Sequence, residues 1–519
     1  MNRIKYAELD VNIEIFRCLA ICLVLFAQFS GSNVFGTQGS SNFSPEQASE
    51  AQKETGPAKP NILYISIDDL NNWVEYLQGH PQVKTPNMNR LAARGIAFTN
   101  AHCTTPLCNP SRSAILSGLS ESKTKVYTNG NSFKPSEFTV LPRYFAENGY
   151  TTYGIGKIHH RKINNELFQV YAEPEQRWSP FTSSAVTYTE EELPSKGSDN
   201  PQHIIEDGPG GKTYVLPFNH MSSERSPNSK KGESFDWAAF DLPDEAFGDG
   251  MATDWAIEKL KGHEGNKPFF MGVGYYRPHI PLYAPKVYFD LYPLESIQLP
   301  EVRADDLDDI PDAGIERALK AVTAGTHKHV LAHEQWKQAV QAYLACISFI
   351  DSQIGELLDY LDSSPYAHNT IIVLFSDHGW HLGEKQAWGK FSGWIHSTNT
   401  PFIICPAGKR AKAQCHEPVS LLDIYPTLVE MAGLPEIELD GSSLVPWLKN
   451  PDLDQDRVIT TYVGKETYAL STSKWRLIHY GDGSEELYNI QEDPLEFTNL
   501  IEHAEYRSIV KQMKKNIRK

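Results

Sequence analysis

The sequence predicts an α/β fold, in which a large, mixed but mostly parallel sheet is flanked by helices and a smaller antiparallel sheet lies near the C-terminus. Two observations predict the large sheet: short runs of continuously apolar residues are typical of buried parallel strands, and they alternate with segments of helical periodicity. A third observation predicts the smaller sheet, because beyond about Gly441 the apolar runs become short and are broken by glycine-containing turns.

The expected strands of the large sheet are apolar runs followed by polar or charged residues. The first run, Asn61 to Ile67, precedes Asp68-Asp69, and the clearest run, Thr370 to Phe375, precedes Ser376-Asp377-His378. The other expected strands span residues 150–154, 268–275 and 401–405. Because ligands of α/β sheets bind at the carboxyl ends of the strands, we expect these polar residues to lie at a functional site.

Three segments between these runs have helical periodicity. Residues 85–95 place Leu91 and Ala92 inward and have Gly95 as a stop signal. Residues 141–149 form a second expected helix, and Trp336 to Leu361 a long third one with apolar side chains on one face. In the C-terminal part, short strands are expected around Tyr462 and at residues 475–478 and 486–488.

The N-terminus resembles an export signal. Arg17 precedes an apolar run from Cys18 to Phe29, which is shorter than the roughly 20 residues that span a bilayer. We therefore expect a signal peptide at residues 1–36, export to the periplasm or medium of a bacterium, and no stable membrane insertion; a retained N-terminal anchor is the alternative. The expected organisation continues with a disordered linker at 37–59, a catalytic α/β domain at 60–440 with a long insertion at 161–250, and a C-terminal subdomain at 441–519.

Charge and cysteine content limit the possible functions. A formal net charge of −17 argues against a nucleic-acid-binding protein but leaves an anionic substrate possible, because a few local cations can dominate a site. Removal of the signal would leave five cysteines, an odd and small number that does not predict a disulfide scaffold. Pairing of Cys405 with Cys415 stays open at this point.

Carboxylates at two strand ends predict a metal site. Asp68 and Asp69 would repel each other without a cation, and Asp377 with His378 follows another strand, so the two segments could share a divalent ion. The alternative is that the Asp68-Asp69 pair only caps the next helix.

The segment Cys108-Asn109-Pro110-Ser111-Arg112, with Leu116 and Gly118 downstream, carries the strongest functional signal. A lone cysteine before a helix is more often structural than reactive. This segment, however, resembles the Cys-x-Pro-Ser-Arg signature of type I sulfatases. The resemblance implies an alkaline-phosphatase-like sulfatase fold and a formylglycine made from Cys108 by a formylglycine-generating enzyme, with its aldehyde hydrate as the nucleophile.

The resemblance spans about residues 61–500 and is closest to the iduronate-2-sulfatase branch. It is carried by residues 68–70, 156–160, 274–281, 376–384, 388–390 and 486–500. Position by position, it implies that Asp68, Asp69, Asp377 and His378 hold a divalent cation together with the modified Cys108. Calcium is the family's usual ion, but many sulfatases have Asn where His378 stands, and imidazole is an unusual calcium ligand, so magnesium stays open.

The resemblance also implies catalytic roles. Arg112 would hold the hydrate, and Lys157 would lie between it and the sulfate. His279 and Lys390 would contact the sulfate or the leaving oxygen, one of them as general acid, and His160 would act as the base. The role of the neighbouring His159 stays open.

The substrate is expected to be a sulfated uronate or hexose of a polysaccharide. Arg277 either pairs with a sugar carboxylate or braces its own loop. His381 and His396, with Trp380, Trp388 and Trp394, are candidate substrate contacts, whereas His80 and His102 are expected to be structural. Two alternative functions are a phosphate or phosphonate ester hydrolase of the same superfamily and a non-catalytic protein that binds sulfated glycans.

Overall fold

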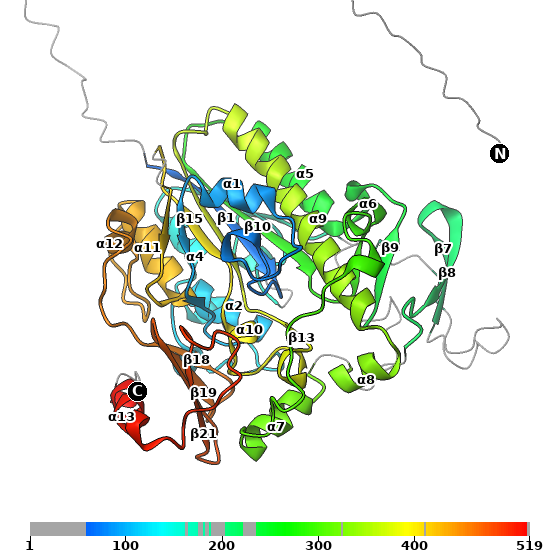
Figure 1. Cartoon of the computed structure of the whole chain (residues 1–519). Helices are drawn as coiled ribbons and strands as arrows, with labels where there is room; N and C mark the ends of the chain where they lie inside the picture. The colour runs from blue at the N-terminus through cyan, green and yellow to red at the C-terminus, as the bar shows by residue number, and fades with distance from the viewer. Residues whose placement is uncertain are drawn as a thin grey trace, which may run out of the picture. The chain divides into compact units, whose positions relative to one another are not determined.

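An eight-stranded sheet runs through the centre of the protein (Figure 1). In spatial order its strands are β16 (Ala413–Cys415), β2 (Ile96–Phe98), β15 (Phe402–Cys405), β12 (Thr370–Ser376), β1 (Asn61–Asp68), β10 (Phe269–Pro278), β4 (Thr151–Gly156) and β5 (Val170–Ala172). The strands from β12 to β5 are all parallel, and β15 is antiparallel to both of its neighbours. The predicted mixed, mostly parallel sheet is therefore confirmed, with every expected strand in it.

The computed structural model describes residues 59–160, 164–174, 180–181, 186–187, 203–221, 235–322, 325–408 and 412–515. Residues 58–519 form one compact unit. The expected signal peptide and nearly all of the expected linker lie outside the described residues. Within the described residues, no helix is both long and apolar enough to cross a membrane.

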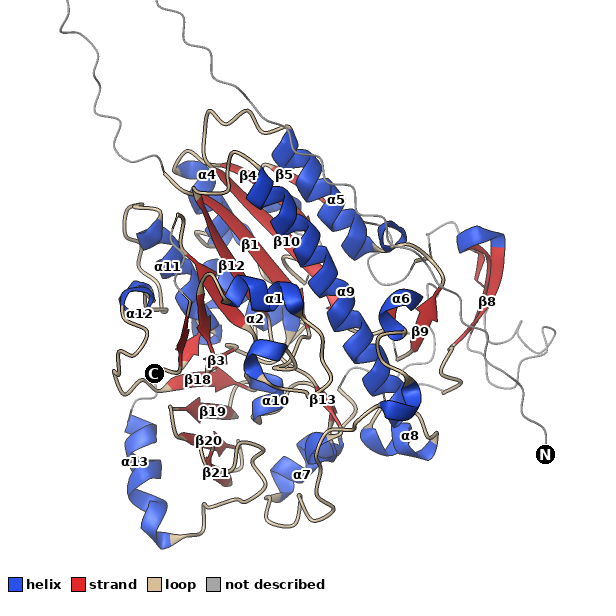
Figure 2. Cartoon of the chain, turned by 45° about the horizontal axis from the view of Figure 1, so that its top comes forward, coloured by secondary structure: helices blue, strands red, loops and turns tan. Residues whose placement is uncertain are grey.

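Helices cover both faces of the sheet because β1 alternates between two cores. Leu63, Ile65 and Ile67 face one core, and Ile62 and Tyr64 face the other. The first core is closed by α1 (Pro86–Ala92), α5 (Gly248–Lys261) and α9 (Trp336–Ser363), and the second by α2 (Cys108–Ser117), α4 (Leu141–Glu147) and α11 (Ile424–Met431). Figure 2 shows α1, α5 and α9 together along one side of the strands.

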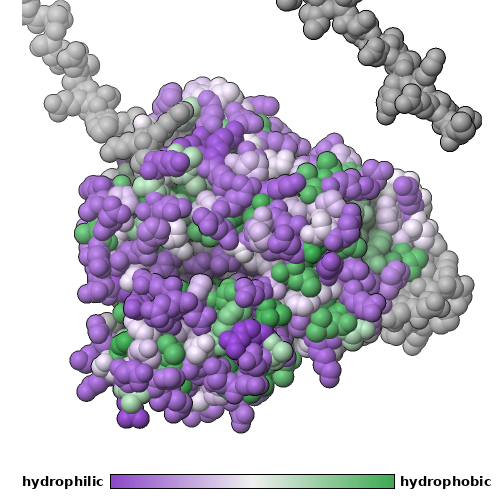
Figure 3. Space-filling view, in the orientation of Figure 1, coloured by the Kyte–Doolittle hydropathy of each residue, from purple (hydrophilic) through white to green (hydrophobic). Residues whose placement is uncertain are grey.

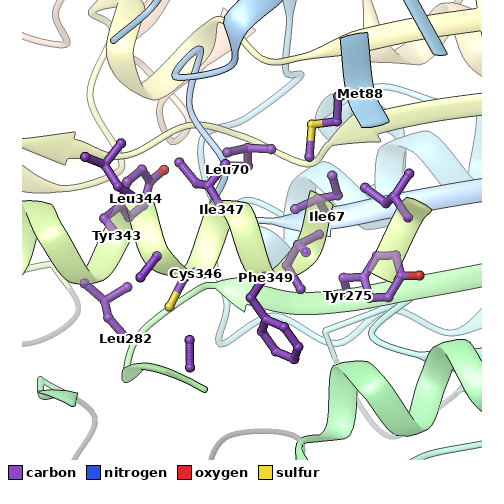
Figure 4. Close-up of a cluster of buried hydrophobic side chains, with 14 of the residues drawn as sticks. Ile67, Leu70, Met88, Tyr275, Leu282, Tyr343, Leu344, Cys346, Ile347 and Phe349 are labelled. Atoms are coloured by element: carbon purple, nitrogen blue, oxygen red, sulfur yellow. The ribbon is translucent and has the colours of Figure 1, made fainter. Parts of the chain in front are cut away.

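The long helix α9 fixes the carboxyl end of β1. Figure 4 shows its side chains, among them Leu344 and Ile347, beside Ile67 and Leu70. The Tyr343 hydroxyl donates a hydrogen bond of 2.7 Å to the carbonyl of Asp69 and accepts one of 3.0 Å from the Asn71 amide. The helix thus both completes the core and positions the turn that follows β1.

The predicted C-terminal sheet is confirmed. It is antiparallel and consists of β18 (Ile459–Tyr462), β19 (Tyr468–Ser471), β20 (Trp475–His479) and β21 (Glu485–Asn489). The helix α13 (Arg507–Lys515) packs against this sheet through Met513.

The described parts of segment 161–250 contain more regular structure than its polar composition indicates. Besides β5, they include a three-stranded sheet of β6 (Val186–Thr187), β7 (His203–Gly208) and β8 (Lys212–Leu216). The strand β9 (Trp237–Phe240) pairs in parallel with β11 (Leu282–Pro285). The strands β6, β7 and β8 pair with one another, whereas β5 and β9 pair with strands outside the segment.

The remaining elements are short. They are β3 (Ala101–His102), β13 (His381–Leu382), β14 (Trp388–Gly389), β17 (Val419–Ser420), α3 (Glu121–Thr124), α6 (Lys286–Phe289), α7 (Asp312–Leu319), α8 (His327–Ala332), α10 (Ile395–Thr398) and α12 (Val445–Lys449). Polar side chains cover most of the face in Figure 3, and apolar ones form small separate patches.

The expected helix stop at Gly95 is wrong, and the open question of a Cys405–Cys415 disulfide is settled. The first helix ends at Ala92, and Gly95 is not its stop: a Cβ at Gly95 would lie 2.6 Å from the Ile404 carbonyl oxygen, so glycine there permits close packing against β15. Cys405 and Cys415 are both free and buried, so they form no disulfide.

Candidate active site

The carboxyl ends of four parallel strands meet at one edge of the sheet, as the sequence predicts. Asp68 is the last residue of β1, Asp377 follows β12 directly, Lys157 follows β4 and His279 follows β10. The first residue of α2, Cys108, lies against the same edge, with its thiol 3.8 Å from Asp69 Oδ1. Five chain segments therefore bring their candidate site residues together.

A turn after β1 makes both adjacent aspartates point into the site. Asp69 has a φ of 61°, a conformation that non-glycine residues adopt only when surrounding contacts hold them. Those contacts are the Tyr343 bond to its carbonyl and a 3.2 Å hydrogen bond from its amide to Asp377 Oδ1. In a straight strand the two carboxylates would have pointed to opposite faces.

Four buried side chains offer a preformed set of metal ligands. One donor atom each of Asp68, Asp69, Cys108 and His378 lies within 4.8 Å of the others. Asp69 Oδ2 is buried and accepts no hydrogen bond; His279 Nε2 is 3.8 Å away. Carboxylates with an unsatisfied oxygen fit a divalent cation, so the residues present suit the ion that the sequence predicts.

Asp377 lies beside this set but is already engaged. Its Oδ2 accepts a 2.7 Å hydrogen bond from Arg112 Nε, and its Oδ1 accepts from the Asp69 amide. His378 Nε2 is 3.6 Å from Asp377 Oδ2. A role for Asp377 as a direct metal ligand stays a prediction.

Arg112 braces the strand ends from within the protein. Its buried guanidinium also donates to Asp68 Oδ1 at 3.3 Å, to Ser66 Oγ at 3.1 Å and to the carbonyls of Lys157 and Ile158. Because these hydrogen bonds engage the N–H groups of the guanidinium, Arg112 is held against the carboxylates from the protein interior. Its predicted direct contact with residue 108 stays a prediction.

Cationic groups surround Cys108. Lys390 Nζ lies 3.1 Å from Cys108 Sγ and 2.6 Å from Asp69 Oδ1, and Lys157 forms an ion pair with Asp68. Burial raises the pKa of the Cys108 thiol, but Lys157, Lys390 and His378 together with their neighbours hold this pKa well below its ordinary value. His160 also contributes to the lowered pKa of the thiol. Position 108 is thus built to carry negative charge.

A cavity of about 1020 Å³ is lined by Leu107, which precedes Cys108, and by Lys390, which contacts the Cys108 thiol; Cys108 itself is buried behind them. Three predicted catalytic residues line it: His160, His279 and Lys390. Its other walls come from parts of the chain to which sequence reasoning assigned no function: residues 128–130, α7 with the residues after it, and the turn at 481–482. These segments carry no motif, and only the fold brings them to the site.

Several predicted substrate contacts lie elsewhere. Arg277 is buried and donates to the carbonyls of Tyr283 at 2.9 Å and His279 at 3.3 Å, so it braces its loop. The candidates His381, His396, Trp380, Trp388 and Trp394 are buried and do not line the cavity.

The three other histidines considered in the sequence have structural contacts. His80 Nε2 contacts the Gln298 carbonyl, His102 Nε2 contacts Asn100 Oδ1, and His159 Nε2 contacts Ser113 Oγ at 3.0 Å.

Gly156 holds β4 and β10 close together immediately before Lys157, and its replacement tests this packing. Gly156→Ala is expected to lower the free energy of unfolding by about 3 kcal/mol or more, because φ is 73° and a Cβ would lie 2.1 Å from the Gly274 carbonyl oxygen. Gly149→Ala is the control: its φ is 91°, but no atom lies within 4 Å, so about 1 kcal/mol is expected. Equal losses in urea denaturation would contradict this reading of Gly156.

The site combines four buried candidate metal ligands with cationic side chains and an adjoining cavity. The sulfatase profile matches residues 60–434, and a profile described as N-sulphoglucosamine sulphohydrolase, C-terminal, matches residues 383–519. The chain therefore belongs to the sulfatase family, whose members hydrolyse sulfuric esters.

Two relatives support the assignment. A sulfatase of Formosa agariphila is 38% identical over 487 residues, covering 90% of this chain and 88% of the relative. The iduronate 2-sulfatase of Homo sapiens is 29% identical over 458 residues, covering 79% of this chain and 77% of the relative. The predicted resemblance to sulfatases, including the iduronate-2-sulfatase branch, is confirmed.

Solved structures confirm the fold. A 2-O GAG sulfatase aligns with a TM-score of 0.64 at 23% identity, covering 88% of this chain and 90% of that one. The phosphonate monoester hydrolase of Agrobacterium radiobacter aligns with a TM-score of 0.66 at 20% identity, covering 88% and 94%. At these identities, the two structures support the fold and not a particular substrate.

Proposed function

We propose that this protein removes sulfate from a sulfated carbohydrate, with a formylglycine made from Cys108 and a bound divalent cation. The observation that carries the proposal is the position of Cys108, which contacts the candidate metal ligands and Lys390 beside the cavity. The expected sugar is a sulfated uronate or hexose, in line with the similarity to iduronate 2-sulfatase.

Maturation would convert the Cys108 thiol to an aldehyde. The Cβ–S bond breaks, the sulfur leaves as hydrogen sulfide, and an oxygen atom takes its place on Cβ. Two electrons pass to an oxidant that a formylglycine-generating enzyme uses. The low pKa of the thiol does not perform this oxidation, so the proposal needs that enzyme as a partner.

The candidate ligands Asp68, Asp69 and His378, with residue 108 and with Asp377 beside them, would hold calcium or magnesium. The cation would supply positive charge against the sulfate oxygens, and an aldehyde hydrate at residue 108 would supply an oxygen nucleophile.

The chain's own cations would stabilise the charge that develops on the sulfate. Lys157 and Lys390 lie within hydrogen-bond distance of the carboxylates beside Cys108. Fixed ammonium groups in a site shielded from water stabilise such charge strongly. Arg112 would keep Asp68 and Asp377 in place by its hydrogen bonds.

Proton transfer would use the two histidines of the cavity. Lys390 Nζ is held by Asp69 and the thiol, whereas His279 is partly exposed at the cavity wall and 3.8 Å from Asp69 Oδ2. This favours His279 as the acid that protonates the leaving sugar oxygen. His160, which lines the cavity, would take a proton from residue 108 in the second half of the reaction.

Ester selectivity tests the proposal against its alternatives. We expect kcat/KM for an aryl sulfate to exceed that for the matching aryl phosphate, and sulfate release from a panel of 2-O- and 6-O-sulfated uronate and hexose oligosaccharides. Faster phosphate or phosphonate hydrolysis would favour the phosphoester alternative. Glycan binding without release of either ion by the matured protein would favour the non-catalytic alternative.

A further inference from the structure

The cavity wall carries a guanidinium that forms no ion pair with any carboxylate of the described residues. Arg317, near the end of α7, lines the cavity together with His160, His279 and Lys390. Its Nη1 donates to the Phe391 carbonyl at 3.2 Å, and its guanidinium carbon lies 5.1 Å from the centre of the Phe391 ring. Arg317 is thus held in position by neutral groups.

Three other buried or partly buried guanidinium groups have carboxylate partners, whereas the buried Arg277 donates to backbone carbonyls. Arg112 pairs with Asp377, Arg457 with Asp423 and Arg476 with Glu496, each at 2.7 Å. Among the described residues, no carboxylate lies within ion-pair distance of Arg317. Burial accordingly lowers the pKa of Arg317 below its ordinary value, although an arginine stays charged. A partly buried, unpaired cation is costly, and an anion entering the cavity would offset that cost.

We propose that Arg317 binds a second oxyanion of the glycan, a carboxylate or a further sulfate, away from the sulfate that is removed. The inference rests on the proposed function of the same cavity and narrows the substrate to a glycan with at least two anionic groups. The planar fork of arginine suits both kinds of oxyanion. The cavity, about 1020 Å³, lies at the upper end of the range for drug-sized ligands and leaves room beyond one sulfated sugar.

The other arginines near the site are not available for this task. Arg112 is committed to Asp377 and Asp68, and Arg277 to two backbone carbonyls. Arg317, by contrast, has one bond to a backbone carbonyl and an aromatic contact.

Acidic residues also line the cavity, and they affect how a second oxyanion would be bound. Asp312, Glu316 and Asp482 are exposed, so water and salt screen their charges, as they do for Lys320. Arg317 is more buried, so its charge acts through a lower dielectric. A second oxyanion would therefore be bound by directed hydrogen bonds from Arg317 and not by a generally positive wall.

The test compares Arg317→Ala and Arg317→Lys with the parent protein on three defined disaccharides. One carries a single sulfate and no carboxylate, one adds a uronate carboxylate, and one adds a second sulfate. Arg317→Ala is expected to raise KM about ten- to a hundredfold for the substrates whose second oxyanion it binds, with kcat unchanged. The KM of Arg317→Lys should lie between those of the parent protein and Arg317→Ala. Comparison of the two dianionic substrates shows whether Arg317 recognises a carboxylate or a sulfate.

Arg303→Ala is the matched control. Arg303 also lies over an aromatic ring, that of Phe497 at 5.5 Å, but it does not line the cavity. An equal loss for the monosulfated substrate with Arg317→Ala would overturn the proposal, because Arg317 would then act by holding Phe391 next to Lys390.

Calorimetric binding of the same disaccharides to the Cys108→Ala variant, with and without Arg317→Ala, separates this proposal from the hydrolase proposal. An Arg317-dependent Kd for a dianionic disaccharide, without turnover by the matured parent protein, would reject the hydrolase and keep this assignment. Equal Kd values with and without Arg317→Ala would reject the proposal that Arg317 binds the second oxyanion.

Discussion

Replacement of Cys108 by alanine is expected to reduce sulfate release at least about ten-thousandfold, the scale of losing a covalent nucleophile. The side chain lies 3.4 Å from His378 Nε2 and 3.1 Å from Lys390 Nζ, inside the candidate ligand set. Neighbouring hydroxyls cannot substitute for it, because Ser111 Oγ donates to the Asp377 carbonyl at 2.6 Å and Ser113 Oγ contacts His159. Initial rates of sulfate release measure the effect.

A control must separate the effect of removing a buried thiol from the effect of removing the nucleophile. Cys346→Ala removes an equally buried free cysteine from α9, so it should lower stability while leaving kcat unchanged. Comparable activity losses in the two variants would mean that Cys108 supports the fold and is not the nucleophile.

The second large effect is expected at Asp69. Asp69→Asn should abolish stoichiometric cation binding and reduce kcat/KM by about a thousandfold, because the carboxylate belongs to the candidate ligand set and one of its oxygens has no hydrogen bond. Metal content by mass spectrometry and the rise of Tm with added calcium or magnesium measure cation binding directly. A cation that binds only the folded state raises Tm, and Asp69→Asn should remove that rise.

Asp236→Asn is the control for a buried aspartate. Asp236 accepts hydrogen bonds from the amides of Phe218, Asn219 and Trp237 and lies outside the ligand set. We expect this variant to lose stability but to keep its cation. Full metal content in Asp69→Asn would contradict the assignment of the ligand set.

The sequence predicted the parts of the site that lie at strand ends. Asp68, Asp377 and His279 each come at or just after the end of an apolar run, and parallel strands bring their carboxyl ends to one edge of the sheet; Lys157 is indicated only by the family resemblance. The sequence predicts the Cys108 motif for a different reason, because its residues are consecutive in the chain and lie on one helix. Both kinds of signal are local in the chain.

Other parts of the site could not be predicted because they depend on long-range packing. The guanidinium of Arg277 could pair with a sugar carboxylate, but carbonyls of the turn at residues 279–283 accept its hydrogen bonds. Arg317 lies on a short helix without a motif, and only the path of the chain between α7 and Phe391 brings it to the cavity. The left-handed conformation of Asp69 likewise follows from contacts with Tyr343 and Asp377, 274 and 308 residues away.

The central claim, that Cys108 becomes the formylglycine of a sulfatase, is tested most directly by the mass of the peptide containing Cys108. The protein is co-produced with a formylglycine-generating enzyme, and sulfate release from the sulfated oligosaccharides is measured on the same preparation. We predict a mass loss matching thiol-to-aldehyde conversion, with activity in proportion to the converted fraction. An unmodified thiol in a preparation that releases sulfate at full rate would contradict the account, as would complete conversion without any release.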